Sequence, residues 1–299
     1  MKSRVEYAPV WILIQVLKFL PRPLARAMCT GVAILLYAIL PRLRQVGLRN
    51  LELAFPEKSE RERRHILRGV YISLGRLLSE IPKFSSYSRE NVGRIAIYDG
   101  FENFERARAR GKGVLFLTAH LGGWEIGSFV HSLHGNPLHV VMRALDNPYI
   151  DAYTRNLRTL HGNSLIDKDE FARGVLAALR KGDTVGVLMD TNMLSGEGEF
   201  VDFFGHPAST TTSVARLAMR TDAAVVPAFT IWDPNLGKYR IHFEPMIHTI
   251  RTGDDNADAI TNTARYTKLI EDFIRRYPDQ WLWVHRRWKT RPSGQLSLY

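Results

Sequence analysis

The stretch GVLFLTAHLGGWEIG, residues 113–127, decides how this chain folds. Six apolar or near-apolar residues, 114–119, run directly into a histidine, two glycines and a glutamate. An uninterrupted apolar run of this length is typical of a strand buried on both faces. The glycines that follow predict a tight turn into a helix. The stretch therefore indicates a strand–turn–helix unit, with His120 at the end of the strand.

The same succession of a predicted strand and a predicted helix recurs along the chain. Short apolar runs that predict strands occupy residues 113–118, 138–142, 184–189 and 223–229. Amphipathic segments that predict helices lie between them, for example residues 169–182 and 209–221. Strands that alternate with helices predict an α/β fold with a mostly parallel sheet flanked by helices.

Three polar residues come within two positions of a predicted strand end: His120, Arg143 and Asp190. In a parallel sheet covered by helices, ligands bind beyond the carboxyl ends of the strands. We therefore expect these three side chains to contribute to one site.

His120 and Glu125 form the central hypothesis. If His120 ends the strand and Glu125 lies in the first helical turn, a carboxylate can hold one ring nitrogen and leave the other free to accept a proton. Gly122 and Gly123 would let a ligand approach closely and leave N–H groups free at the helix start. The alternative is a structural histidine at the end of a buried strand.

Composition limits the classes of protein. The chain has 299 residues, 45% of them hydrophobic, which suits one large domain or a domain with an appendage. Its single cysteine, Cys29, excludes an internal disulfide framework and a multi-cysteine zinc site. Residues 1–112 hold 21 Lys and Arg against 10 Asp and Glu, and the rest holds 20 of each, so the net charge of +11 lies in the first third. Such a basic field indicates an anionic partner.

The N-terminus predicts a membrane contact. Residues 8–20 are apolar but too short to span a bilayer, and residues 24–40 reach the lower limit yet include Arg26. Flanking cations favour helices that lie on an anionic leaflet. We therefore divide the chain into N-terminal membrane-anchoring helices, 1–45, and a catalytic domain, 46–299. Ordinary buried helices and a signal peptide cleaved near residues 25–27 are the alternatives.

The sequence lacks the motifs of several kinds of catalytic site. No G-x-S-x-G nucleophile elbow is present, and Cys29 lies in the expected membrane segment, which argues against a covalent acyl-enzyme. H-E-x-x-H is absent, and the spacings of His131, His134 and His139 match no standard metal site. A basic protein without a recognition-helix or RNA-binding pattern has little support as a nucleic-acid binder.

The block HLGGWE, residues 120–125, resembles the H-x4-D/E motif of the lysophospholipid acyltransferase superfamily. The chain more closely resembles the late acyltransferases of lipid A biosynthesis, the lauroyl and myristoyl transferases of Gram-negative bacteria. The blocks that carry this resemblance are MRALDNPYID (142–151), GVLMD (186–190), VDFFGHPASTTTSVARLA (201–218), AVVPAF (224–229) and YPDQWLWVHRRWKTRP (277–292).

The resemblance implies a fold like that of glycerol-3-phosphate acyltransferase and an activity. Such enzymes move a fatty acyl chain from acyl carrier protein, or sometimes coenzyme A, to a hydroxyl of a membrane glycolipid at the cytoplasmic face of the bacterial inner membrane. His120 would be the general base and Glu125 its acidic partner, with no metal or redox cofactor. Alternatives are an acyltransferase for a phosphatidylinositol mannoside or a lysophospholipid, and a non-catalytic glycolipid-binding membrane protein.

The other blocks provide candidate substrate-binding residues. Arg143 would bind a phosphate or steady the thioester oxyanion, or would only pair with Asp146. Asp190 would orient a neighbouring side chain, or be a buried carboxylate without a catalytic part. The remaining candidates are Phe204 and Gly205 as an apolar wall or a loop anchor, Thr211 at a helix start, and Arg286 and Arg287 in a basic cluster that ends a strand-like segment near the glycolipid head group.

Overall fold

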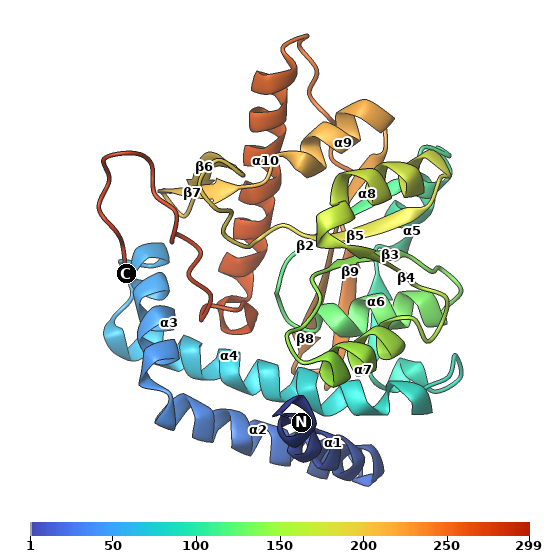
Figure 1. The fold of residues 1–299 in the computed structure, drawn as a ribbon, viewed down its shortest axis with the longest axis vertical. Coiled ribbons are helices and arrows are strands. Elements are labelled where there is room, and N and C mark those ends of the chain that lie inside the picture. The colour runs from blue at the N-terminus through green and yellow to red at the C-terminus, as the bar shows by residue number, and fades with distance from the viewer. Residues whose placement is uncertain (1) are drawn as a thin grey trace.

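The computed structural model describes residues 2–299 as a central sheet with helices on both faces (Figure 1). The helices are α1 (Lys2–Phe19), α2 (Arg22–Ile39), α3 (Pro41–Ala54), α4 (Glu60–Glu80), α5 (Phe101–Arg108), α6 (Trp124–Leu133), α7 (Pro148–Arg158), α8 (Phe171–Arg180), α9 (Ser213–Thr221) and α10 (Asp255–Arg276). The strands are β1 (Ala96–Asp99), β2 (Val114–Thr118), β3 (His139–Met142), β4 (Ser164–Asp167), β5 (Thr184–Leu188), β6 (Glu199–Phe203), β7 (His206–Thr210), β8 (Ala224–Asp233) and β9 (Lys238–Phe243).

Seven strands form one sheet in the order β1-β9-β8-β2-β5-β3-β4. Every neighbouring pair is parallel except β8 and β9, which form a hairpin. The predicted α/β class with a mostly parallel sheet is confirmed, and the four strands expected from apolar runs are β2, β3, β5 and β8.

The continuous apolar run of β2 follows from burial on both faces. Leu115 and Leu117 belong to the core cluster that α8, α9 and α10 complete, whereas Val114 and Phe116 belong to the cluster under α5 and α6. Neither face of this central strand meets water, so the strand shows no alternation of polar and apolar residues.

The sequence block around Phe204 and Gly205 makes a second, two-stranded sheet of β6 and β7. Phe203 pairs with His206, so Phe204 and Gly205 are the two turn residues. Both have positive φ, 56° and 78°, as a two-residue hairpin of this twist requires. Glycine adopts this conformation freely, but phenylalanine does so at a cost. The carboxylate of Glu271 accepts a hydrogen bond of 2.7 Å from the Phe204 amide and helps to hold the turn.

The N-terminal helices pack against the α/β body of the protein. In Figure 1, α1 and α2 lie along one edge of the molecule, and α4 lies between α2 and the sheet. A buried carboxylate fastens α2 to α4: Glu80 has a fully buried side chain, and its Oε1 lies 2.6 Å from Arg22 and 3.5 Å from Arg26. Tyr87 donates a 2.6 Å hydrogen bond to the other oxygen.

The opposite sides of α1 and α2 expose large apolar side chains. The most exposed are Phe19 at 81%, Val5 at 68%, and Ile12 and Leu24 at 57% each. By length and composition α2 qualifies as a membrane-spanning helix, with a mean hydropathy of 1.3 over residues 22–39, of which 17% are buried. Signal sequences and core helices of soluble proteins share these properties.

Replacing Glu80 by alanine should destabilise the fold by about 3 kcal/mol, because it leaves two partly buried guanidinium groups without their common carboxylate. Urea unfolding measures this loss. The matched control is Glu60→Ala, which breaks the exposed pair of Glu60 with Arg64 and should leave the free energy of unfolding nearly unchanged. Equal effects of the two substitutions would show that Glu80 does not fasten α2.

Candidate functional site

Two loops at the carboxyl ends of neighbouring parallel strands bring His120 and Asp190 together. Thr118, the last residue of β2, pairs with Leu188, the last residue of β5. His120 and Asp190 each follow two residues later, so strand register alone places them side by side. The Nδ1 atom of His120 lies 2.9 Å from Oδ1 of Asp190.

Asp190 is buried and accepts three hydrogen bonds. Besides the imidazole, the backbone N–H of His120 donates to Oδ2 at 2.9 Å, and the indole N–H of Trp281 donates to the same oxygen at 2.7 Å. Burial alone would raise the pKa of Asp190, but the charge of His120 and these donors outweigh it and hold the pKa at about 2. Asp190 is therefore ionised at any physiological pH and acts only as an acceptor.

His120 is thereby fixed in one tautomer. An ionised carboxylate on Nδ1 requires that nitrogen to carry the proton, which leaves Nε2 with a free lone pair. Within residues 2–299 no protein group bonds to Nε2, and the side chain is 24% exposed. Burial lowers the pKa of His120, but the negative charges of Asp190 and Glu125 outweigh burial and raise it above its ordinary value. This is the environment of a general base.

Glu125 lies in the first turn of α6, as expected, but its partner differs from our prediction. The carboxylate binds the guanidinium of Arg158 on α7 through both oxygens, with 3.0 Å between Nε and Oε2. Glu125 affects His120 as a nearby charge, whereas Asp190 makes the direct hydrogen bond.

The turn between His120 and α6 explains this arrangement. The amide of Gly122 donates to the carbonyl of Gln280 at 2.9 Å, and that of Gly123 donates to the carbonyl of Thr230 at 2.7 Å. These bonds pull the turn onto β8 and the C-terminal segment. The two glycine amides are therefore occupied, and the expectation that they remain free for a ligand is wrong.

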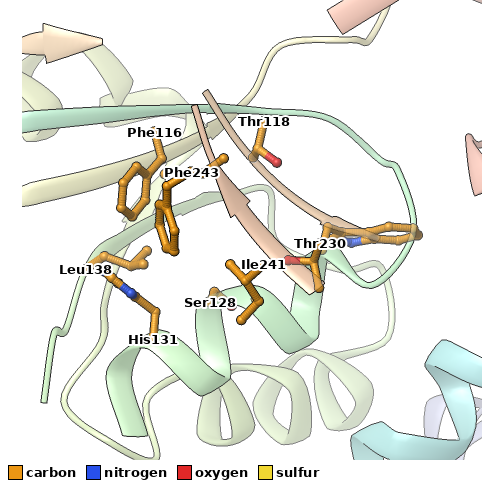
Figure 2. Close-up of a pocket in the computed structure, with 12 residues that line it drawn as sticks. Phe116, Thr118, Ser128, His131, Leu138, Thr230, Ile241 and Phe243 are labelled. Carbon is orange, nitrogen blue, oxygen red and sulfur yellow. The ribbon is translucent and has the colours of Figure 1, made fainter. Parts of the chain in front are cut away.

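An apolar cavity of about 60 Å³ lies between the sheet and α6, beside His120. Trp124 lines it, and its ring packs edge-to-face against the His120 imidazole with 5.3 Å between centroids. Figure 2 shows Phe116, Leu138 and His131 gathered at one end of the cavity, with Thr230 at the other. Burial lowers the pKa of His131 to about 3, so this imidazole is neutral and the cavity wall is uncharged.

The other predicted residues have varied surroundings. Arg143 is exposed and lies 3.5 Å from Asp146, the surface pair we considered as its alternative role. Phe204 is buried against Phe55 and Trp283 and thus anchors the hairpin to the core. The helix expected to open at residues 209–212 begins at Ser213, because residues 206–210 form β7; Thr211 accepts a hydrogen bond from the Ser213 amide.

The C-terminal block departs most from expectation. Residues 281–290 form no strand; they follow turns, with one bridge between Trp281 and Leu121. Arg287 is fully buried and donates to the carbonyl of Ser209 at 2.8 Å and to the hydroxyl of Thr210 at 2.5 Å. It cannot belong to an exposed basic cluster, because those backbone and hydroxyl acceptors on β7 draw it into the core.

Nowhere in residues 2–299 do three or more His, Cys, Asp or Glu side chains gather in a way that could hold a metal ion.

Comparisons with known proteins agree with this fold and site. The family model described as bacterial lipid A biosynthesis acyltransferase matches residues 3–290. The chain belongs to this family. It is 30% identical to the Escherichia coli lipid A biosynthesis lauroyltransferase and 28% identical to the palmitoleoyltransferase of the same organism, in each case over 97% of this chain and 92% of the relative. The E. coli myristoyltransferase is 26% identical over 86% of this chain and 78% of its own.

In this member of the lipid A acyltransferase family, three side chains around His120 and Asp190 could not be predicted from local sequence patterns. Trp281 donates to Asp190 across 91 positions of sequence, and no local pattern indicates that contact. Arg158, which holds Glu125, lies at the end of an amphipathic helix, where a basic residue is ordinary. Trp124 lies inside the H-x4-E block, between His120 and Glu125, and this position is the one sequence feature that indicates a contact with His120.

Proposed function

We propose that this protein transfers a fatty acyl chain from an acyl thioester, of acyl carrier protein or coenzyme A, to a hydroxyl of a lipid A precursor. One observation carries the proposal: a histidine held by a buried aspartate stands beside an apolar cavity, in a chain of the lipid A acyltransferase family. No metal or redox cofactor takes part in the proposed reaction.

His120 is the general base of the proposed mechanism. Its Nε2 takes the proton of the acceptor hydroxyl as that oxygen attacks the thioester carbonyl carbon. The carbon–sulfur bond then breaks, and the leaving thiolate takes up the proton from the imidazolium. Asp190 stabilises the imidazolium directly and Glu125, held by Arg158, stabilises it through space. The N-terminus of α6, which has no side-chain cap, supplies N–H groups for the oxyanion.

In this proposal the acyl chain enters at the cavity beside Trp124; because the volume of the cavity is only about 60 Å³, the lining side chains must move apart to admit a whole fatty acyl chain. Its wall is largely aromatic and aliphatic, and its histidine is neutral, so the site excludes charged groups and favours methylenes. Thr118 lines it two positions before His120, which places the thioester end of a bound chain near the base.

Substituting Gly186 by leucine should shift the enzyme toward shorter acyl chains. Gly186 lines the cavity on β5, and a Cβ added there would lie 3.4 Å from Leu138, another lining residue. Each methylene that no longer fits should lower kcat/KM about tenfold relative to wild type. The measurement is competition between donors of different chain length, read by mass spectrometry.

The matched control is Gly93→Leu, at a position where an added Cβ meets nothing within 4 Å. It should leave the chain-length preference unchanged. An unaltered preference in Gly186→Leu, in a protein that folds normally, would place the acyl chain elsewhere.

The N-terminal helices support membrane attachment in this proposal. One side of α2 is fastened to α4 through Glu80, and the other side, with that of α1, exposes large apolar residues. A helix held along its length by the catalytic body suits an orientation in the plane of the cytoplasmic leaflet, with its apolar side in the acyl region. In the proposal, the site then lies near lipid substrates at the cytoplasmic face of the inner membrane.

The proposal is tested by incubating the purified protein in mixed micelles with acyl carrier protein and coenzyme A thioesters and with either a lipid A precursor or a lysophospholipid. The expected product is a lipid A precursor heavier by one acyl group. Transfer only to the lysophospholipid would support the alternative acceptor. No transfer to either, with the substrates bound, would indicate a non-catalytic lipid-binding protein.

A further inference from the structure

A groove of about 500 Å³ opens on the side of the protein formed by α3, the loop after β5 and the C-terminal segment. Its lining contains three cations and no acidic residue. It is made by Arg42, Leu43, Val46, Asn192, Leu194, Val284, His285, Arg286 and Lys289.

The three cations have no protein counter-charge. Arg42, Arg286 and Lys289 take part in none of the ion pairs found in residues 2–299. A turn with a 3.2 Å bond from the Lys289 amide to the Arg286 carbonyl brings these two residues close in space. Arg286 stacks on the ring of Tyr299, with 5.6 Å to the centroid, so it is partly ordered before any ligand arrives.

The groove adjoins the catalytic loops. Its Asn192 follows Asp190 by two residues, and the backbone N–H of Asn192 donates to Nε2 of His285, also in the groove, at 3.1 Å. The carbonyl of His120 accepts a 3.1 Å hydrogen bond from Leu282 in the same C-terminal segment. A ligand in the groove therefore lies against the segments that hold the base.

The rim of the groove is apolar. Leu43 and Leu194 line it and are 40% and 56% exposed. Leu36, Ile39 and Leu40, just before α3, are also exposed and join this rim to the apolar side of α2. Cations in a hollow beside an apolar surface suit a ligand that has an anionic head and hydrocarbon chains.

We propose that this groove binds the phosphorylated head group of the acceptor lipid, with Arg42, Arg286 and Lys289 contacting phosphate oxygens. The inference rests on the proposed acyl transfer and names the part of the acceptor that the enzyme recognises. A phosphate bound there would hold the acceptor while its reactive hydroxyl reaches His120. Arg42 links recognition to the N-terminal helices, because it stands in the first turn of α3.

The test compares the variant Arg42→Gln/Arg286→Gln/Lys289→Gln with the control Arg180→Gln/Lys181→Gln, which removes exposed charges at the end of α8. Acceptors are a phosphorylated lipid A precursor and the same lipid with its phosphates removed. Loss of charge-assisted hydrogen bonds should raise the KM for the phosphorylated acceptor by at least about tenfold, leaving the KM for the thioester donor unchanged. The control should behave as wild type.

A second measurement separates this inference from the proposed function. Vesicles of zwitterionic phospholipid with or without the phosphorylated acceptor are floated with wild type, the groove variant and His120→Ala. Acceptor-dependent flotation that His120→Ala keeps and the groove variant loses supports the groove, even if no transfer is seen. Unchanged flotation and KM in the groove variant would overturn it. So would a raised KM for the acyl carrier protein donor alone, which would make the groove a docking surface for that acidic protein.

Discussion

Replacing His120 by alanine is expected to lower kcat by about three orders of magnitude, because the acceptor hydroxyl then loses the group that takes its proton. Nδ1 of this imidazole bonds to Asp190, and Nε2 bonds to no group of the described residues 2–299. The loss should appear in kcat with little change in the KM of either substrate. Single-turnover assays with saturating donor and acceptor measure it.

A second histidine–aspartate pair provides a matched control. His139 lies 3.1 Å from Asp183, and its side chain is 24% exposed, as that of His120 is. The pair stands at the amino end of β3, away from the strand ends that form the site. His139→Ala should keep full activity, and both variants should unfold at similar temperatures. Near-normal turnover in His120→Ala would rule out His120 as the general base.

The sequence predicts the buried strands and their mostly parallel arrangement, and this is why His120 and Asp190 could be expected at one edge of the sheet. Apolar runs mark buried parallel strands, and parallel register brings residues that follow the strands to one edge. His120 and Asp190 were both placed there, and the structure joins them. Arg143 follows β3 at the same edge, yet it stays exposed beside Asp146, because nothing in the strand rule fixes the direction of a side chain.

Contacts between distant segments could not be predicted. Closeness in sequence favours a contact between Glu125 and His120, but a side chain at a helix start can face either way, and here Glu125 binds Arg158 on another helix. From the sequence, the charge of Arg287 and the apolar side chain of Phe204 suit contact with a ligand as well as burial in the core. Their burial depends on β7 and on Glu271, far away in the chain. Local patterns describe elements, whereas these roles arise from packing between elements.

The carboxylate of Asp190 provides the sharpest test of the site. Its Oδ1 accepts from the imidazole, while its Oδ2 accepts from the His120 amide and the Trp281 indole. In Asp190→Asn only one oxygen remains. If that oxygen takes the place of Oδ2 and accepts from both of its donors, the new NH2 group faces Nδ1 of His120. Nδ1 must then accept a hydrogen bond, so the imidazole carries its proton on Nε2 and that nitrogen cannot act as a base. We expect kcat to fall by about 10³ to 10⁴.

The pH profile distinguishes this loss from simple unfolding. Only the neutral imidazole accepts a proton, so kcat/KM of the wild type should rise with pH through the pKa of His120, which Asp190 and Glu125 raise above its ordinary 6.5. Without the Asp190 charge, burial is the dominant influence, and the residual activity should have its acid limb at lower pH. Asp183→Asn, at the control pair, should leave both rate and limb unchanged. If the acid limb of the Asp190→Asn pH profile stays at its wild-type position, Glu125 alone raises the pKa of His120.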